Sequence, residues 1–327
     1  MRRSTALWLA LGALVLVAGG VALTGKFYAE KALATGPNGP ETPASVGVPF
    51  ERVSIPSHNR RLDGYLVRAP KDCKDPPAIL IYHGFNETIS YWVEAQGLLW
   101  RHCVSSLVFD PSGNGDSTRP AGPWTLTQDA PAAYAFARSR FAAPTRLYVM
   151  GHSLGDAVML EAEPKLQPQP SGVIVADSFS SLKAFLVRHG TSPLVVGAIP
   201  DVWDNVKAVG KVRAPILVMH SDADVMTPLE GAREVYDAAN QPKQFAVLHG
   251  FKHNGSRRHT SVTWWEPALT FVASPGVSTA SLQPPPPPAG DQDPLAAERA
   301  REEQLRYGAS LLTPAGSSSP AARPGAH

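Results

Sequence analysis

Residues Leu147 to Gly155 read Leu-Tyr-Val-Met-Gly-His-Ser-Leu-Gly, an apolar run that leads into a Gly-x-Ser-x-Gly pentapeptide. A helix-capable segment, Asp156 to Glu163, follows directly. A strand, a sharp turn and a helix in this order are typical of a nucleophile elbow, where a side chain at either glycine position would obstruct the turn. The pattern predicts Ser153 as a nucleophile and directs the Leu154 backbone N–H towards a developing oxyanion.

The segments on either side of this turn alternate between strand-like and helix-like patterns. Two runs, Phe50–Pro56 and Leu62–Arg68, predict a hairpin. Short apolar runs, expected where helices cover both faces of a parallel sheet, then occur at Ala78–Tyr82, Val104–Phe109, Arg146–Met150, Gly172–Ala176, Ile216–His220 and Gln244–Leu248. Helical candidates are Tyr91–Arg101, Leu126–Arg140, Leu229–Ala239 and Val262–Val272. The alternation predicts an α/β fold with a mostly parallel central sheet flanked by helices.

A serine hydroxyl becomes a good nucleophile when a base removes its proton and a carboxylate orients that base. In this strand–turn–helix context the expected order along the chain is Ser, acid, His. The strand Ile216–His220 leads into two candidate acids, Asp222 and Asp224. Two histidines, His249 and His253, follow the last strand. We expect His253 to be the base, with His249 as its rival.

A second oxyanion donor should come from the loop after an early strand. Residues 79–85 read Ile-Leu-Ile-Tyr-His-Gly-Phe, which gives the Phe85 N–H this position. Gly84 would let the backbone approach the substrate closely, and His83 should order the loop. All four elements follow strands, at the sheet edge where open α/β sheets place their sites.

These motifs together resemble the α/β-hydrolase superfamily over residues from about 50 to 273, and within it the membrane-anchored α/β-hydrolase-domain proteins related to serine aminopeptidases. The matching pieces are Tyr82–Gly84, Asp110–Ser117, Gly151–Gly155, Asp177–Leu182, Trp203–Asn205, Pro215–His220 and His253–Asn254. In such proteins a strand ending in His-Gly-x-x-Asp, followed by Pro, carries the acid at the Asp. The resemblance therefore implies Asp224, followed by Pro228, as the acid, and leaves Asp222 as a turn residue.

Two positions depart from the pattern of that family. Asp156 stands just after the elbow, where the family has a small residue, and its charge would oppose the transition state if it pointed at the oxyanion site. Ser221 replaces the common glycine beside the acid loop. Neither change removes a catalytic group, but both leave a catalytically inactive protein open as an alternative.

The expected function is a serine hydrolase that cleaves a carboxylic ester or thioester through Ser153, His253, Asp224 and an acyl-enzyme, with no metal or organic cofactor. A small cap is expected over about residues 179–212, whose apolar side chains could favour acyl substrates or could simply pack the cap. The alternatives are a peptidase of the serine aminopeptidase-like type and an inactive, membrane-tethered binding protein.

The two ends of the chain differ in character from the middle. Residues 4–25 carry no charge and follow two arginines, so they would span roughly 33 Å as a helix. We expect residues 1–25 to be a membrane anchor rather than a cleaved signal peptide, with the catalytic domain on the extracytoplasmic side. Residues 26–48 predict a linker and 49–274 the hydrolase domain. The Pro-rich residues 275–327 predict a disordered tail that offers, at most, weak partner docking.

Charge and cysteine content narrow the remaining possibilities. The formal net charge is +2, and the basic residues are scattered, so no nucleic-acid partner is indicated. The two cysteines, Cys73 and Cys103, lie in no metal-binding pattern. Cys103 opens an apparent buried strand, where a lone thiol behaves as a small hydrophobe. We therefore favour unpaired thiols, although an oxidising compartment would allow a disulfide.

Overall fold

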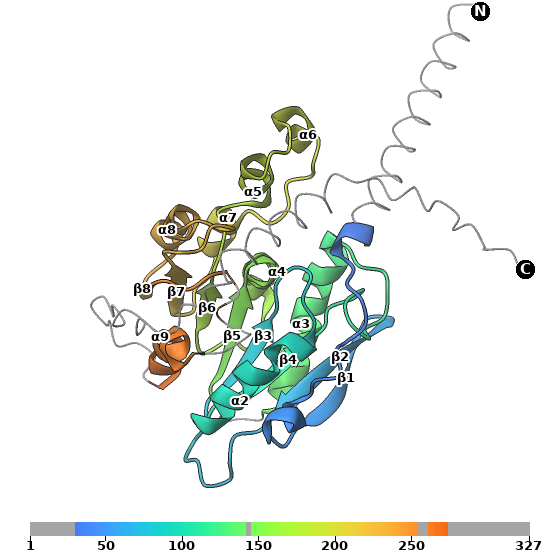
Figure 1. Cartoon of the computed structure of the whole chain (residues 1–327), viewed down its shortest axis with the longest axis vertical. Coiled ribbons are helices and arrows are strands. Elements are labelled where there is room, and N and C mark those ends of the chain that lie inside the picture. The colour runs from blue at the N-terminus through green and yellow to red at the C-terminus, as the bar shows by residue number, and fades with distance from the viewer. Residues whose placement is uncertain (1–29, 142–144, 254, 256–260, 274–327) are drawn as a thin grey trace, which may run out of the picture. The chain divides into compact units, whose positions relative to one another are not determined.

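The computed structural model describes residues 30–141, 145–253, 255 and 261–273. They contain one eight-stranded sheet in the order β1-β2-β4-β3-β5-β6-β7-β8 (Figure 1). The antiparallel hairpin β1–β2 joins β4 through an antiparallel pairing, and the other pairs are parallel. The strands are Glu51–Ser57, Arg60–Val67, Ala78–Tyr82, Ser105–Phe109, Leu147–His152, Val173–Ala176, Ile216–Ser221 and Lys243–Leu248. The predicted hairpin and mostly parallel sheet are confirmed.

The register of the central strands brings the predicted site together. Tyr82 at the end of β3 pairs with Gly151 of β5, and His152 pairs with Ala176 at the end of β6. Ala176 in turn pairs with Met219 of β7. Strands β3 to β7 are buried at every position because packed side chains cover both faces of the sheet. The elbow therefore lies between the loops that follow β3 and β7.

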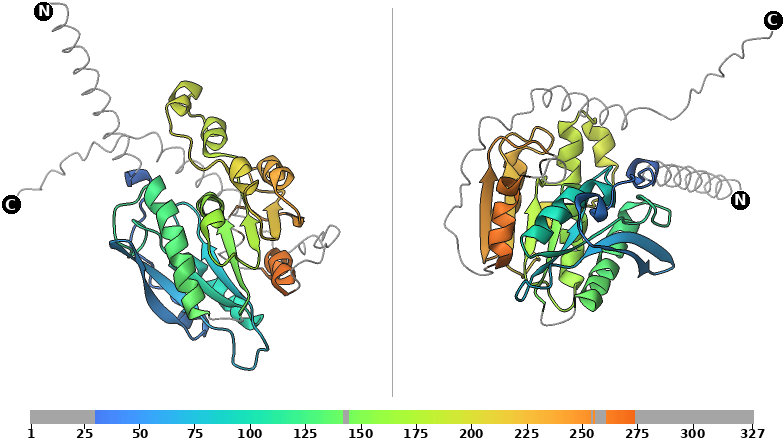
Figure 2. Two further views of the ribbon diagram at one scale, coloured as in Figure 1. Left: turned by 180° about the vertical axis from the view of Figure 1, so that it is seen from behind. Right: turned by 60° about the horizontal axis from the view of Figure 1, so that its bottom comes forward.

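Two apolar layers cover the sheet. One contains residues of α3, α4, α7 and α8, and the other contains residues of α2 and α9. Figure 2, which includes a view from behind, shows α3 on the face opposite α2. The α-helices are α2 Val93–Arg101, α3 Pro123–Arg140, α4 Leu154–Ala162, α5 Leu182–Arg188, α6 Pro193–Gly197, α7 Asn205–Val209, α8 Leu229–Ala238 and α9 Val262–Ala273; the short 3-10 helices are η1 Pro43–Val46, η2 Ile89–Trp92 and η3 Glu163–Lys165. The four helices expected from the sequence are confirmed.

The segment expected to form a cap carries three short helices between β6 and β7. Figures 1 and 2 show α5 and α6 projecting away from the sheet, whereas α7 lies beside it. No side chain of α5 is fully buried, but Val209 of α7 belongs to the core. The projecting part is therefore α5 with α6, and α7 belongs to the body.

Part of the expected linker is packed against the body. Thr35 is buried, its N–H donates to the Gly113 carbonyl at 3.2 Å, and its hydroxyl accepts from the Gly115 N–H at 2.9 Å. The Ser90 hydroxyl donates to the Gly39 carbonyl at 3.1 Å. Among the described residues no helix has both the length and the apolarity to cross a membrane. The expected anchor (1–25) and tail (275–327) lie outside the described residues.

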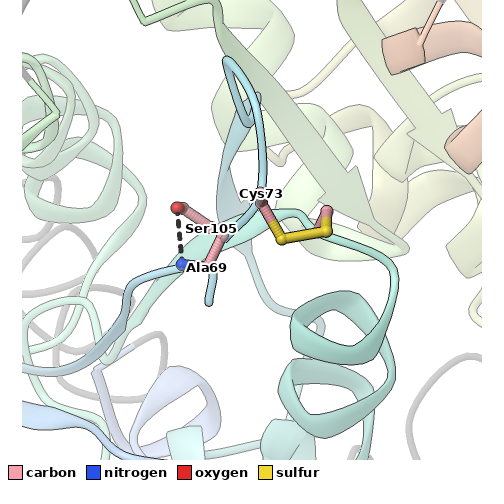
Figure 3. Close-up of a disulfide and its surroundings, with 4 residues drawn as sticks. Ala69, Cys73 and Ser105 are labelled. Atoms are coloured by element: carbon pink, nitrogen blue, oxygen red, sulfur yellow. Dashed lines mark hydrogen bonds between the residues drawn. A yellow bond between two sulfur atoms is a disulfide. The ribbon is translucent and has the colours of Figure 1, made fainter. Parts of the chain in front are cut away.

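The expectation of unpaired thiols is wrong, because Cys73 and Cys103 form a disulfide with their Cα atoms 5.6 Å apart (Figure 3). Cys103 has a positive φ of 59° in the exposed turn between α2 and β4, and the buried run begins only at the next residue. Its thiol is therefore not part of the core.

The strand pairing explains why these cysteines meet. β3 and β4 are parallel neighbours, with Ala78 opposite Ser105, so the loops that precede them lie side by side. One cysteine lies in each loop. In the same region the Ala69 N–H donates to the Ser105 hydroxyl at 2.9 Å (Figure 3). Sequence spacing alone does not show that these two strands pair.

Candidate active site

The turn at Ser153 is a strained elbow. Ser153 has φ 53° and ψ −117°, which a side-chain-bearing residue rarely adopts, and its N–H donates to the Ala176 carbonyl at 3.0 Å. A Cβ at Gly151 would lie against the Asp156 backbone, and one at Gly155 would overlap the Tyr82 carbonyl. Both glycines are therefore required by close packing, as the sequence predicts.

Ser153, His253 and Asp224 are linked by two consecutive hydrogen bonds. His253 Nε2 is 2.9 Å from Ser153 Oγ, and His253 Nδ1 is 2.7 Å from Asp224 Oδ2. All three are buried or nearly so, with exposed fractions of 9% for Ser153, 8% for His253 and 4% for Asp224. The residues come from the elbow after β5, the β8–α9 loop and the β7–α8 loop, and the structure brings all three sequence candidates together.

Asp224 is held in place by its own loop. Asp224 Oδ1 accepts from the Met226 N–H at 2.8 Å and the Thr227 N–H at 3.0 Å. Burial disfavours the carboxylate, but the charge and hydrogen bond of His253 and the hydrogen bond from the Thr227 N–H outweigh it, so the pKa of Asp224 lies well below its ordinary value. Asp224 is therefore ionised at neutral pH and can stabilise an imidazolium.

Thr227 is a site residue that the sequence analysis missed. Its Oγ1 lies 2.7 Å from Asp224 Oδ2, 3.1 Å from His253 Nδ1 and 3.1 Å from the Asp177 carbonyl. The hydroxyl thus contacts both the candidate acid and the candidate base. In the sequence, the one indication of this role is the position of the threonine three residues after an acid at a strand end, which is typical of a local turn.

The rival candidates form a separate pair. Asp222 Oδ2 lies 2.6 Å from His249 Nδ1, and Asp222 Oδ1 accepts from the Gly250 N–H at 2.9 Å. Despite partial burial, these hydrogen bonds and the histidine hold the pKa of Asp222 below its ordinary value. Both side chains are about a third or more exposed, unlike Asp224 and His253. The same two loops therefore carry one buried and one exposed Asp–His pair.

Asp156 points away from the oxyanion side of the elbow. It is fully buried, and its Oδ1 accepts from the Ala176 N–H of β6 at 3.3 Å. Burial raises the pKa of Asp156 well above its ordinary value, although the neighbouring His152 opposes this. The Asp156 carboxyl is directed at β6 and not at the oxyanion side of the elbow. The conflict that the sequence raised is thus removed by orientation.

His152, directly before the nucleophile, is fully buried between two carboxylates. Its Nδ1 lies 3.3 Å from Glu87 Oε1, and its Nε2 lies 3.6 Å from Asp177 Oδ2 and 3.0 Å from the His253 carbonyl oxygen. Burial favours the neutral ring, but the two carboxylates outweigh it and raise the pKa of His152 to about 10. His152 is therefore a buried imidazolium at neutral pH.

The loop after β3 is fixed from both sides. His83 Nε2 lies 3.2 Å from Asp110 Oδ1, and its Nδ1 lies 2.9 Å from the Gly84 carbonyl oxygen. The Gly84 N–H donates to Glu87 Oε2 at 3.1 Å. His83 thus orders this loop, as expected, and Glu87 is a second residue that the sequence analysis missed.

The two expected oxyanion donors line one pocket. Phe85, from the loop after β3, and Leu154, at the start of α4, both border an apolar pocket beside the elbow. The Leu154 N–H is at the first position of α4, where helix N–H groups have no partner within the helix. The structure thus brings the two expected donor residues to the same pocket.

Ser221 joins two loops of the site. Its hydroxyl donates to the carbonyl oxygen of Phe251, two residues before the candidate base His253, and accepts from the Ala223 N–H at 3.3 Å. The serine that replaces the usual glycine therefore connects the acid loop with the base loop. This departure adds a contact and removes none from the candidate triad.

One group of described side chains has the spacing of metal ligands. Asp177, His220 and Asp224 offer atoms within 4.8 Å of one another. Two of the three side chains bond to the acid loop: His220 Nε2 lies 2.5 Å from the Thr227 carbonyl oxygen, and Asp224 accepts hydrogen bonds from Thr227. Asp177 Oδ2 lies 3.6 Å from His152 Nε2.

Comparison with known proteins agrees with this architecture. No family model matches the chain. It is 27% identical over 179 residues to an uncharacterized Mycobacterium tuberculosis protein, covering 54% of this chain and 63% of that protein. It is 27% identical over 195 residues to lysophosphatidylserine lipase ABHD12 of Danio rerio, covering 54% of this chain and 50% of that protein. It is 21% identical over 194 residues to bem46 of Schizosaccharomyces pombe, covering 57% of this chain and 64% of that protein. The chain spans between half and two thirds of the length of these curated relatives.

Solved structures show the same fold. The Pyrococcus furiosus esterase Pf2001 superposes with a TM-score of 0.59 at 14% identity, over 73% of this chain and 95% of that one. Est1E of Butyrivibrio proteoclasticus, solved with ferulic acid, gives 0.53 at 19% identity, over 67 and 96%. By its sheet order, its elbow and these superpositions, the chain has the α/β-hydrolase fold, and its sequence is similar to ABHD12 and bem46.

Proposed function

We propose that the chain is a serine hydrolase that cleaves a carboxylic ester or thioester. The observation that carries the proposal is the continuous contact from Ser153 Oγ through His253 to Asp224, at 2.9 and 2.7 Å, on a strained elbow. The neighbouring histidine and carboxylate of the exposed pair have no such contact with Ser153 among the described hydrogen bonds.

In the proposed reaction His253 Nε2 takes the proton of Ser153 Oγ as that oxygen attacks the substrate carbonyl carbon. Asp224 stabilises the imidazolium, and the N–H groups of Phe85 and Leu154 stabilise the oxyanion. The bond from the carbonyl carbon to the leaving oxygen or sulfur breaks, and the leaving group receives the proton from His253. Water then gives a proton to His253 and attacks the acyl carbon. The bond from that carbon to Ser153 Oγ breaks, His253 returns the proton to Ser153 Oγ, and the acid is released.

Esters or thioesters are proposed ahead of peptides on two grounds. The name of the ABHD12 relative is that of a lipase, and Pf2001, which shares the fold, is called an esterase. In addition, the pocket beside Leu154 is lined mainly by apolar side chains. The disulfide between Cys73 and Cys103 supports an oxidising compartment, in line with the proposed membrane anchor and extracytoplasmic domain.

Active-site labelling of the full chain with a fluorophosphonate tests the proposal. Wild type should be labelled and should hydrolyse a p-nitrophenyl ester, and Ser153→Ala should lose both. The exposed-pair variant His249→Gln is the matched control and should keep labelling. Absence of labelling and of ester hydrolysis in folded wild type would contradict the proposal and favour a binding protein. Faster cleavage of an aminoacyl anilide than of the ester would favour a peptidase.

A further inference from the structure

The segment that leads into the hydrolase body forms a strap, defined as residues 30–39, across the loop that follows β4. Thr35 makes three of the strap contacts: its N–H donates to the Gly113 carbonyl, its hydroxyl accepts from the Gly115 N–H, and its carbonyl accepts from Arg119 Nη2 at 3.0 Å. Another contact joins Asn38 Nδ2 to Asp63 Oδ2 at 3.1 Å. The strap is therefore fixed at several points, although its sequence is typical of a linker.

The strap reaches the site through Leu33. This side chain is half-buried and packs against the apolar core. It also lines the pocket that Phe85 and Leu154 border. The remaining wall is largely apolar and comes from β3, β4, α3, α4 and the loops after the two strands: Tyr82, His83, Gly84, Phe109, Pro111, Asn114, Leu126, Gly155 and Val158.

The composition of this wall defines the chemistry of an occupant. The described residues of the wall include no Asp, Glu, Lys or Arg, and its exposed surface is predominantly apolar. The pocket adjoins the elbow, because Leu154 and Gly155 of its wall directly follow Ser153, so the acyl substituent of a carbonyl carbon bound to Ser153 can extend into it. An acyl chain therefore suits the pocket better than a charged or sugar-like leaving group.

The size of the pocket limits the length of that chain. The free volume is about 20 Å³, whereas a cavity needs about 10–15 Å³ to hold a single water molecule. This volume corresponds to one or two water molecules, which leaves room for about one methyl group. Leu33 occupies space that a longer chain would need, because it lines the pocket from the strap side.

We propose that this pocket binds the acyl group of the substrate, that it selects acetyl and propionyl groups, and that Leu33 of the strap sets this limit. The inference rests on the proposed function, because it requires an acyl-enzyme at Ser153. It makes the strap part of the substrate site and Leu33 a specificity-determining residue.

The acyl-length preference of the full chain tests this proposal. We would measure kcat/KM for p-nitrophenyl esters from acetate to octanoate. Wild type should favour acetate and propionate over octanoate by at least about 10-fold, because one unaccommodated methylene can cost a factor of about 10 or more. Leu33→Ala should raise kcat/KM for butyrate and hexanoate, relative to acetate, by about 10-fold. Leu33→Met, which retains the volume, should keep the wild-type profile.

Gly36→Ala is a matched control within the strap, because a Cβ there meets no atom within 4 Å. It should leave the profile unchanged. The inference would be overturned if Leu33→Ala changed kcat/KM by the same factor for all esters, or if wild type preferred octanoate. Fluorophosphonate labelling of Ser153 would in that case still support the hydrolase function. Loss of labelling and of all ester hydrolysis in wild type would instead reject both proposals. If Leu33→Ala does not fold, Leu33→Val should show a smaller shift in the same direction.

Discussion

His152 Nε2 lies 3.0 Å from the carbonyl oxygen of His253, so the residue before the candidate nucleophile holds the backbone of the candidate base. On its other side His152 contacts Glu87, which accepts a hydrogen bond from the Gly84 N–H. One buried imidazolium thus connects the elbow, the loop after β3 and the base loop. This arrangement places three loops relative to one another through a side chain that does not contact Ser153 Oγ among the described hydrogen bonds.

Replacing His152 by Gln should lower kcat by about 10–100-fold with little change in KM, because a hydrogen bond to a charged group contributes about 1.5–3 kcal/mol. The loss should act through the placement of His253, not through substrate binding. Steady-state kinetics on a p-nitrophenyl ester would measure it. The exposed His102→Gln is the control and should match wild type. A raised KM with unchanged kcat would contradict a positioning role.

The two Asp–His pairs give a second prediction. Asp224→Asn should lower kcat by about 10⁴-fold, the size of the effect of the corresponding change in a serine protease triad, since the amide favours the wrong imidazole tautomer. Asp222→Asn should change kcat by less than about threefold, because its partner His249 is exposed to solvent over about a third of its side chain. Comparable losses in the two variants, measured by ester hydrolysis, would show that the acid has been misassigned.

The fold and the three triad candidates could be predicted from the sequence because the ends of the strands can be recognised in it. Apolar runs mark the buried parallel strands, and the motif residues follow those runs directly. Sequence order could not separate Asp222 from Asp224, since both follow the same strand. The direction of each carboxylate depends on the turn at residues 221–227, in which Thr227 and Met226 hold Asp224 inward.

The features that were missed depend on contacts between distant segments. Glu87 acquires its role from the approach of His152, which is far along the chain, and Leu33 meets the pocket because the strap packs on the loop after β4. The disulfide follows from the pairing of β3 with β4, for which neither cysteine carries a local signal. These relationships arise from strand order and loop packing, which periodicity does not encode.

The buried Asp156 should make the protein less stable as the pH rises. Its folded-state pKa is raised, so its protonated form contributes stability that is fully present below the unfolded pKa, about 4, and is lost as the pH rises towards the folded value. Asp156→Asn mimics the neutral form and keeps an oxygen for the Ala176 N–H. Its free energy of unfolding in urea should therefore exceed that of wild type by a margin that grows from about pH 5 to pH 8.

The same variant also tests the orientation of Asp156. Its turnover rate should stay within about threefold of that of wild type, because the carboxyl points at β6 and not at the oxyanion donors. Ester hydrolysis at least about tenfold faster than wild type would mean that a charge on Asp156 opposes the transition state. Asp201→Asn, at an exposed carboxylate with a lowered pKa, is the control and should not increase stability at high pH.

The disulfide should stabilise the fold without taking part in the chemistry. It closes a sequence separation of 30 residues across the loops that precede two central strands, and a bond of this kind typically contributes about 2–4 kcal/mol. Cys73→Ser, Cys103→Ser and the double variant should each lower Tm by about 5–15 °C, to a similar extent, because each removes the same bond. Calorimetry would measure the shift, and labelling at Ser153 should be retained below Tm. Additive losses in the double variant, or no effect of a reducing agent on the wild-type Tm, would contradict a stabilising bond between these residues.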